Sequence, residues 1–331
     1  MSLRRRAFLA LAGSAATLPC IRAFAQDEAD PASTAQSESL RVLLGQGDAQ
    51  SADHGFIFDG QPYRGTFVRL DDGSIVNVVG IEQYLYSVVP REMSPGWPAA
   101  ALQAQAICAR TYVLQRSSPR RNYDLVPSEL DQVYRGVLGE SPAGRSAVDS
   151  TAGQVLRFGR NFASVAYSSC CGGHTESSAD AWGGAPIAYL GGVACRFCND
   201  SPNYRWSAQV PVDDLVQRLG AAATFGNLRD VRIAGTDGSG RARAFDLIGD
   251  GGSVTVKGTT FRSSVGARVV RSLLITRLSV DRGASAVAFE GGGLGHGVGL
   301  CQWGARGIAL AGRNVRDILA FYFPGTGLTN D

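Results

Sequence analysis

The sequence contains very little lysine. Lys257 is the single lysine among 331 residues, and the 32 basic residues barely outnumber the 29 acidic ones. Four arginines (Arg4, Arg5, Arg6 and Arg22) lie in the first 25 residues, which contain no acid, so the rest of the chain carries 28 basic and 29 acidic residues. A nucleic-acid-binding surface requires a clear basic excess. The charge balance therefore argues against nucleic acid as a partner.

Long apolar runs are also scarce. Residues 4–18 (RRRAFLALAGSAATL) combine a cationic start with an apolar run of about a dozen residues, which is shorter than the ~20 needed to span a bilayer. A small-x-small cleavage site, Ala23-Phe24-Ala25, follows, so residues 1–25 are predicted to be an export signal peptide. Its Arg5-Arg6 pair resembles a twin-arginine signal, whose pathway carries folded proteins. We expect no transmembrane anchor and an exported protein of the periplasm or cell wall.

Glycine is abundant instead, with 42 residues, and its short clusters indicate many tight turns. Residues 26–39 are polar and acidic and are predicted to be a flexible linker, so the fold begins near residue 40. The pattern beyond it predicts a mixed α+β fold over residues 40–328, with a strand-rich α+β subdomain at 207–290 inserted in it. The expected strands are 40–44, 66–70, 75–79, 155–158, 162–167, 231–233, 244–247, 254–256 and 273–278, and the expected helices are 98–117, 212–219 and 315–322.

The segment VVPREMSPGWPAAALQAQAICARTYVLQ carries the first candidate site residue. Glu92 lies between Pro90 and Pro95 just ahead of the long helix, so a stiff backbone should fix its position. Met93 and Trp97 offer apolar surface, and in such surroundings a carboxylic acid keeps its proton more readily. Glu92 is therefore a candidate proton donor. The alternative is a solvated acid near a helix start, where negative charge is favoured.

Three polar residues follow Glu92 on the predicted helix. Gln103 and Arg110 are seven residues apart, which is about two helical turns, so both could project from one face toward a polar ligand. Tyr112 comes next. A solvated helix face is the alternative explanation.

The cysteines form a second constellation. Cys171 and His174 belong to YSSCCGGHTE, and Cys195 and Cys198 form a C-x-x-C pair, a set of ligands suited to tetrahedral zinc. In an exported protein the same cysteines could form disulfides, although export in a folded state would allow zinc to load in the cytoplasm. A redox C-x-x-C site is less favoured because no βαβ pattern surrounds it.

The third segment is GGGLGHGVGLCQWGARGIALAG. Glycines on both sides of His296 allow a ligand to approach the backbone closely. Gln302 could supply a hydrogen-bonding amide, and Trp303 could supply an aromatic face for a sugar ring. The segment lacks the G-K-[ST] ending of a phosphate-binding loop. A merely packed histidine is the alternative for His296.

Together these segments resemble the stage II sporulation protein D family, which includes amidase-enhancer relatives. The resemblance covers nearly everything from about residue 40 to 328, and several long motifs in this order are more specific than any one of them. Beyond the three segments above, it rests on DQVYRG (131–136), Trp182, Tyr189-Leu190, Ser201-Pro202, Trp206 and ILAFYFPGTGL near the C-terminus.

The resemblance implies a peptidoglycan lytic transglycosylase, which cleaves the bond between N-acetylmuramic acid and N-acetylglucosamine and leaves a 1,6-anhydro sugar. Glu92 matches the family's catalytic glutamate. Most glycosidases use two carboxylates, but here the C6 hydroxyl of muramic acid is the nucleophile. Glu92 would therefore protonate the leaving oxygen and then accept the C6 hydroxyl proton. The N- and C-terminal segments would together build the catalytic region.

The resemblance also assigns roles to the other residues. The zinc is expected to be structural, since four protein ligands leave no open position. The sequence departs from the family at Leu300-Cys301, where Met-Ser is more common, and Cys170 beside Cys171 leaves the choice of ligands open. The glycan groove would be lined by Gln103, Arg110, Tyr112, His296 and Gln302, and zinc would be held by Cys171, His174, Cys195 and Cys198.

Two other functions remain open. One is a non-catalytic module that binds peptidoglycan glycan strands and enhances a cell-wall amidase, which would then be its partner. The other is a zinc hydrolase that uses His174 and His296 as metal ligands. Product analysis on glycan strands separates the first from an enzyme, and chelation separates the second from a structural zinc site.

Overall fold

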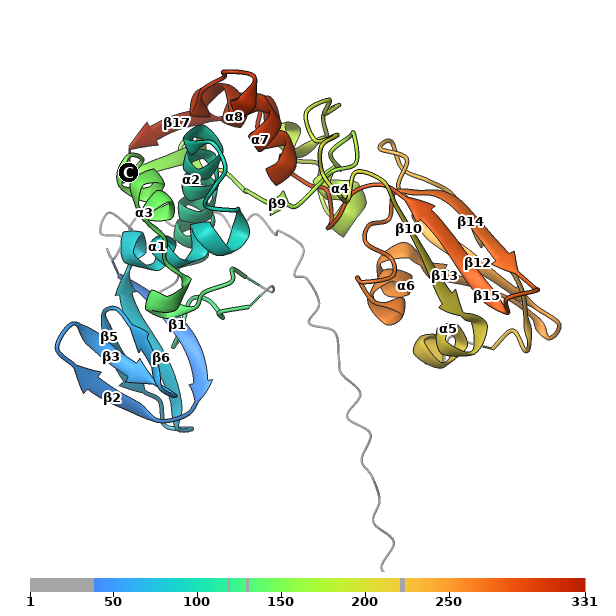
Figure 1. Ribbon diagram of the computed structural model, residues 1–331, viewed down its shortest axis with the longest axis horizontal. Helices are drawn as coiled ribbons and strands as arrows, with labels where there is room; N and C mark the ends of the chain where they lie inside the picture. Colours follow the sequence, from blue (N-terminus) through green and yellow to red (C-terminus); the bar gives the residue numbers. More distant parts are fainter. Residues whose placement is uncertain (1–38, 118–119, 129–130, 221–223, 331) are drawn as a thin grey trace, which may run out of the picture.

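Two hydrophobic cores organise the molecule (Figure 1). The computed structural model describes residues 39–117, 120–128, 131–220 and 224–330, so the predicted signal peptide, and all of the predicted linker except Ser39, lie outside the described residues. The larger core draws on residues 40–198 and 298–323. The smaller core draws on residues 206–289. The chain therefore leaves the first core, builds the second and returns.

Small antiparallel sheets form one end of the larger core. Two of the expected strands form a hairpin: β5 (Thr66–Arg69) pairs with β6 (Ser74–Gly80). Its turn is closed by Asp72, whose carboxylate accepts a hydrogen bond from the Ser74 amide, and by Gly73, whose φ of 84° favours glycine. The sheets have the orders β1-β6-β5 and β2-β3-β4, with β1 (Ser39–Gln46), β2 (Ala49–Ala52), β3 (Gly55–Phe58) and β4 (Gln61–Tyr63).

The helix expected from residue 98 is α2 (Ala99–Arg116), which lies at the centre of the larger core. The sequence suggests one apolar stripe, but 12 of the 18 residues are buried. A helix buried on nearly all sides has neighbours all round it, and Figure 1 shows them. They are α1 (Ile81–Glu92), α3 (Pro142–Asp149), α7 (Gln302–Leu310), α8 (Val315–Tyr322) and β7 (Gln154–Phe158).

The C-terminal segment closes the larger core by pairing with its middle. The last strand, β17 (Gly327–Asn330), joins β7 and β8 (Asn161–Phe162) in one sheet. A short parallel pairing joins β9 (Tyr167–Ser168) to β16 (Leu300–Cys301). The expected strand at 162–167 is thus divided, because the chain leaves the β7–β8 sheet and the Leu300 amide bonds to the Ala166 carbonyl instead.

The second core lies between two three-stranded sheets and two helices, on the right in Figure 1. The predicted mixed α+β fold is confirmed. No helix in the described part of the chain is both long and apolar enough to cross a membrane. The remaining elements are η1 (Gly136–Gly139), α4 (Ser178–Trp182), η2 (Ala188–Leu190), β10 (Trp206–Pro211), α5 (Val212–Leu219), β11 (Leu228–Ile233), β12 (Ala244–Gly249), β13 (Gly252–Lys257), α6 (Gly258–Val265), β14 (Ile275–Asp281) and β15 (Ala286–Gly291).

A buried ion pair ties α2 to α1. The Arg110 side chain is 2% exposed, and its guanidinium makes two hydrogen bonds, of 2.8 and 2.6 Å, to the carboxylate of Glu82. The same group donates to the carbonyl oxygens of Gln154 and Val148. A planar fork suits such bidentate pairing. Arg110 therefore joins α1, α2, α3 and β7 at one point.

This pairing predicts a large loss of stability on removal of the guanidinium. Arg110→Met removes the cationic partner of the Glu82 carboxylate, which is one-third exposed and keeps the Gly153 amide as a donor, so the free energy of unfolding should fall by about 1.5–3 kcal/mol. Urea unfolding followed by circular dichroism measures the change. Arg116→Met is the matched control, because the exposed pair of Arg116 with Asp131 should contribute less than ~1 kcal/mol. Equal losses in the two variants would contradict this role.

Candidate functional site

Glu92 is the last residue of α1, not part of a loop ahead of α2. The two prolines suggested stiff extended backbone, but Pro90 is accommodated inside the helix. The helix ends at Glu92, and the next residue, Met93, is extended. The rigid placement expected for Glu92 thus comes from a helix that packs on α2.

Two hydrogen-bond donors meet the carboxylate of Glu92, which is half-buried. The backbone amide of Val133 lies 3.4 Å from Oε1, and Nε2 of Gln302 lies 3.4 Å from Oε2. The same Nε2 atom lies 3.3 Å from Oε1 of Gln105. Gln302 is buried, so its amide is held between a side chain of α1 and one of α2. The structure therefore brings together Glu92 and Gln302, both predicted site residues.

Two tryptophans neighbour Glu92 and Gln302 in the sequence and contact each other in the fold. Trp97 follows Glu92 by five residues, and Trp303 follows Gln302 directly. Their rings meet edge to face with centroids 5.0 Å apart, and the Arg306 guanidinium lies 5.2 Å from the Trp303 ring centre. Both rings are half-buried. They form an aromatic wall that could contact a sugar ring.

Tyr167 links the surroundings of Glu92 to those of His296. The charge of Glu92 contributes to raising the pKa of the Tyr167 hydroxyl, although burial is the larger cause. The backbone of Tyr167 makes a hydrogen bond with the His296 ring. The predicted site residue His296 therefore lies on a loop next to the strand that carries Tyr167.

His296 is held as a neutral imidazole. Burial is the main reason why its pKa falls from 6.5 to about 4, and the charges of Arg262 and Arg241 act in the same direction. Nδ1 accepts a hydrogen bond of 3.0 Å from the Val298 amide, so the proton is on Nε2. The ring also packs against Trp182 with centroids 5.2 Å apart. This imidazole is oriented by its neighbours on several sides.

Four thiols from three segments converge beside α7. The sulfur atoms of Cys171, Cys195, Cys198 and Cys301 all lie within 4.8 Å of one another, and all four residues are buried. The Cys171 and Cys198 sulfurs are 3.5 Å apart. Tetrahedral zinc with Zn–S bonds of ~2.3 Å would place its sulfurs about 3.8 Å apart. The cluster could therefore hold one metal ion of this type.

The start of α7 contributes one sulfur of this cluster, that of Cys301, which accepts hydrogen bonds from backbone amides. Cys301 is the N-cap of α7, and its sulfur accepts hydrogen bonds from the amides of Cys171 (3.2 Å) and Gly304 (3.4 Å). Helix N-termini favour thiolates. A Cβ at Gly304 would lie 1.9 Å from the Tyr322 hydroxyl and 2.8 Å from the Cys195 sulfur. Only glycine therefore lets α7 approach the thiols this closely.

The cluster differs from the expected ligand set at one position. Cys301 is present in it and His174 is not; Nδ1 of His174 lies 2.6 Å from the carbonyl oxygen of Thr175. Cys170, the other candidate, has its sulfur 3.9 Å from the carbonyl oxygen of Cys198. All six cysteines in the described residues are free. Cys301 reaches the thiols because the β9–β16 pairing places it there, which sequence spacing does not reveal.

The other predicted groove residues have partners elsewhere. Arg110 is in the ion pair with Glu82, and the Tyr112 hydroxyl donates to Asp131 over 2.8 Å. Gln103 donates to the Ser150 hydroxyl over 3.0 Å. The structure thus brings Glu92, Gln302 and Trp303 together, and shows Gln103, Arg110 and Tyr112 in separate contacts along α2.

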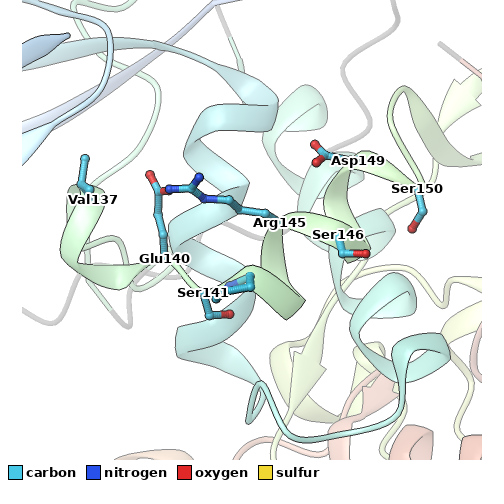
Figure 2. Close-up of a pocket in the computed structure, with 8 residues that line it drawn as sticks. Val137, Glu140, Ser141, Arg145, Ser146, Asp149 and Ser150 are labelled. Atoms are coloured by element: carbon cyan, nitrogen blue, oxygen red, sulfur yellow. The ribbon is translucent and has the colours of Figure 1, made fainter.

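Ser150 lines a surface pocket of about 840 Å³ beside α3 (Figure 2). The Arg145 side chain points toward Glu140 in this view, and the two form an ion pair. Asp149, on the other side, accepts a hydrogen bond from the Tyr86 hydroxyl. Glu140 and Arg145 are therefore paired with each other, and Asp149 has a hydroxyl donor. Its lining includes neither Glu92 nor the thiols.

Three residues of this site are not among those expected from the sequence. Gln105 lies within an apolar helical stretch, where a buried amide needs a partner. Trp97 is expected only as apolar surface near Glu92. Cys301 is expected only as a departure from the family pattern, and the signal for its role is that it adds one more thiol to a cysteine-rich set.

Comparisons with known proteins agree with this arrangement. Residues 71–158, which contain Glu92, match the family model described as stage II sporulation protein, and residues 197–299 match a domain of unknown function, DUF8618. An uncharacterised protein of Brachyspira hyodysenteriae is 33% identical over 83% of this chain and 74% of its own length. Stage II sporulation protein D of Bacillus amyloliquefaciens is 27% identical over 79% of this chain and 77% of its own length.

The amidase enhancer of Bacillus subtilis is also 27% identical, over 74% of this chain, but the match spans 40% of that longer protein. The similarity to the Brachyspira protein extends over most of both chains, and the matched family segment contains Glu92, Gln105 and Val133. The chain therefore belongs to the stage II sporulation protein D family.

Proposed function

We propose that this chain is an exported cell-wall protein that cleaves peptidoglycan glycan strands as a lytic transglycosylase. The observation that carries the proposal is the half-buried carboxylate of Glu92, which lies at a helix end near two donors, one of them the amide of Gln302 next to Trp303. A positioned carboxylic acid of this kind can act as both general acid and general base. The family and an amidase-enhancer relative support a role at the cell wall.

In the first step, Glu92 gives its proton to the glycosidic oxygen that leaves N-acetylmuramic acid, and the C1–O bond breaks. The C6 hydroxyl of the same sugar then bonds to C1, and the Glu92 carboxylate takes the hydroxyl proton. The 1,6-anhydro product forms and the acid is regenerated. The donors from Val133 and Gln302 are placed to stabilise the carboxylate between these steps.

The groove beside Glu92 should recognise sugars through the aromatic wall and the neutral histidine. Arg306 lies over the Trp303 ring, so a sugar must use the parts of Trp97 and Trp303 that Arg306 leaves accessible. The neutral His296 ring is held by the Val298 amide and the Tyr167 backbone, so it would shape the groove without adding charge.

A second candidate function follows from the relative named amidase enhancer. In that case the chain would bind glycan strands through the same groove, without cleavage, and assist a cell-wall amidase. The two functions share a binding surface and differ in whether Glu92 transfers a proton.

For the thiols we propose one structural zinc ion held by Cys171, Cys195, Cys198 and Cys301. Hydrogen bonds from Cys171, Cys198 and Cys301 lower the pKa of the Cys195 thiol, whereas burial raises the pKa of the Cys301 thiol, so a bound zinc ion would supply the charge that keeps all four thiols ionised. Four protein sulfurs would complete a tetrahedral shell and leave no position for a catalytic water. This ligand set does not include the two histidines of the zinc-hydrolase alternative.

The enzyme proposal predicts anhydro products that depend on Glu92. Purified glycan strands incubated with the protein should release fragments ending in 1,6-anhydro-N-acetylmuramic acid, identified by mass spectrometry. Glu92→Gln should reduce their rate of formation by about 10²-fold or more, because the amide cannot transfer the proton. Glu290→Gln, an identical change at an exposed acid, is the control. Binding without products from the unaltered protein would support the amidase-enhancing module instead.

The zinc proposal predicts about one zinc atom per chain in protein exported from its native host. Cys301→Ser should lose most of this metal, whereas His174→Ala and Cys108→Ser should retain it. Elemental analysis together with free-thiol counting measures both. Loss of zinc in His174→Ala with retention in Cys301→Ser would restore the ligand set expected from the sequence. A disulfide mapped to any of the four cysteines would overturn the site.

The lowered pKa of His296 predicts how stability depends on pH. An unfolded chain binds a proton at this residue below about pH 6.5, whereas the folded protein does not until about pH 4. The free energy of unfolding should therefore fall as the pH drops from 6.5 to 4. Denaturant unfolding should show a smaller fall for His296→Gln, and NMR titration of the imidazole should give a midpoint near 4. Parallel stability curves for the two proteins would contradict this.

A further inference from the structure

The residues that form the second core, 206–289, are called the second unit below. One loop of this unit contacts the segment that carries the thiols. It joins β11 to β12, and residues 237–241 of it lie against the segment that carries Cys171 and His174. Its central side chain is Arg241, which is 3% exposed. Because a buried guanidinium needs hydrogen-bond partners, its contacts show what this residue does.

The Arg241 guanidinium holds the backbone of the Cys171 segment at two points. Its Nη2 donates to the Cys171 carbonyl over 2.9 Å, and its Nη1 donates to the His174 carbonyl over 3.1 Å. The Glu176 carboxylate, 2% exposed, lies 3.7 Å from Nη1. One side chain therefore connects the start, the middle and the end of this six-residue segment.

The loop that presents Arg241 is itself closely fixed. The Asp237 carboxylate accepts hydrogen bonds from the backbone amides of Ser239 (2.9 Å) and Arg241 (3.0 Å). The Ser239 hydroxyl lies 2.6 Å from Oε2 of Glu176 and accepts from Nη1 of Arg241 over 2.9 Å. The loop and the Cys171 segment thus form one hydrogen-bonded unit.

The same guanidinium packs against the loop of His296. A Cβ at Gly297 would lie 2.3 Å from Nη2 of Arg241, so the two approach as closely as glycine allows. The Gly297 carbonyl accepts from the Glu176 amide, and the Gly295 amide donates to the Arg271 carbonyl of the second unit. The residues on either side of His296 are therefore both tied into this network.

We propose that the inserted unit is part of the catalytic site and that Arg241 is its positioning residue, which holds the Cys171 segment and the His296 loop in register for glycan binding and cleavage. The inference rests on the proposed function for its catalytic meaning. It assigns a role to residues that lie outside the matched sporulation-protein segment and inside a domain of unknown function.

Stability alone explains this arginine poorly. Burying an ion pair costs about as much as the pairing returns, and an apolar side chain of similar size is often as stable. Nε of Arg241 also has no hydrogen-bond partner among the described residues, which adds to the cost. The geometry that the guanidinium imposes on two loops is what an apolar side chain could not supply.

The test compares Arg241→Met and Arg241→Lys with Arg243→Met in the full exported chain. Arg243 is the matched control because its exposed guanidinium pairs with Asp180 across the same boundary between the two units. Hydrogen exchange of peptides covering 168–177 and 292–299 reports the positions of the two loops without requiring activity. Rates of anhydro-product release on purified glycan strands give kcat and KM, and urea unfolding gives stability.

Arg241→Met should speed exchange in both segments and lower kcat by about 10²-fold, with KM changed much less. Lysine keeps the charge but not the fork, so Arg241→Lys should recover part of kcat. Arg243→Met should match the unaltered protein. If Arg241→Met does not fold, Ser239→Ala should raise exchange in the same two segments to a smaller degree. Unchanged exchange in both segments, or equal effects from Arg243→Met, would overturn the proposal.

The two proposals fail in different ways. If the unaltered protein releases no anhydro product, the transglycosylase proposal fails, while exchange still decides whether Arg241 fixes the loops. If products form and Arg241→Met lowers stability but leaves exchange in the two segments and kcat unchanged, Arg241 is only a structural residue.

Discussion

The parallel pairing of β9 with β16 is the contact on which the site depends. Only two residue pairs are involved, Tyr167 with Leu300 and Ser168 with Cys301, yet they fix where the chain re-enters the larger core. Because successive strand residues point to opposite sides, a slip of one position would exchange the directions of neighbouring side chains. One register therefore places Cys301 at the thiols and starts α7 so that Gln302 reaches Glu92.

Local patterns were enough to predict part of the fold. The helical spacing after residue 98 identified α2, and the expected strands 66–70 and 75–79 are β5 and β6, because periodicity is a property of neighbouring residues. The helix that ends at Glu92 was not predicted. Pro90 suggested a break, but packing of α1 against α2 and α3 outweighs the one hydrogen bond that a proline removes.

Site residues could be predicted where the family resemblance identified them. They could not be predicted where only a contact between distant segments reveals them. Glu92 and Gln302 were expected to share a groove from the family resemblance, and their contact joins residues 210 positions apart. Cys301 and Arg241 had no such guide. The polarity of Arg110 suggested a ligand, yet its partner is Glu82 on the preceding helix. A charged residue on a helix does not itself reveal whether it faces a substrate or a buried carboxylate.

The proposed zinc site and the reaction are connected mechanically rather than chemically. A pairing of two residues contributes little stability by itself. Between its two strands the chain runs through the whole second unit, so forming the pairing closes a long loop at an entropic cost. A metal bound to Cys171 and Cys301 would close the same loop next to the β9–β16 pairing, and closing a long loop removes much of the entropy of the open chain. Gln302 follows Cys301 directly, so the restraint that holds the thiols also holds the amide that contacts Glu92. A zinc ion with no open coordination position can in this way set the geometry of proton transfer without touching the substrate.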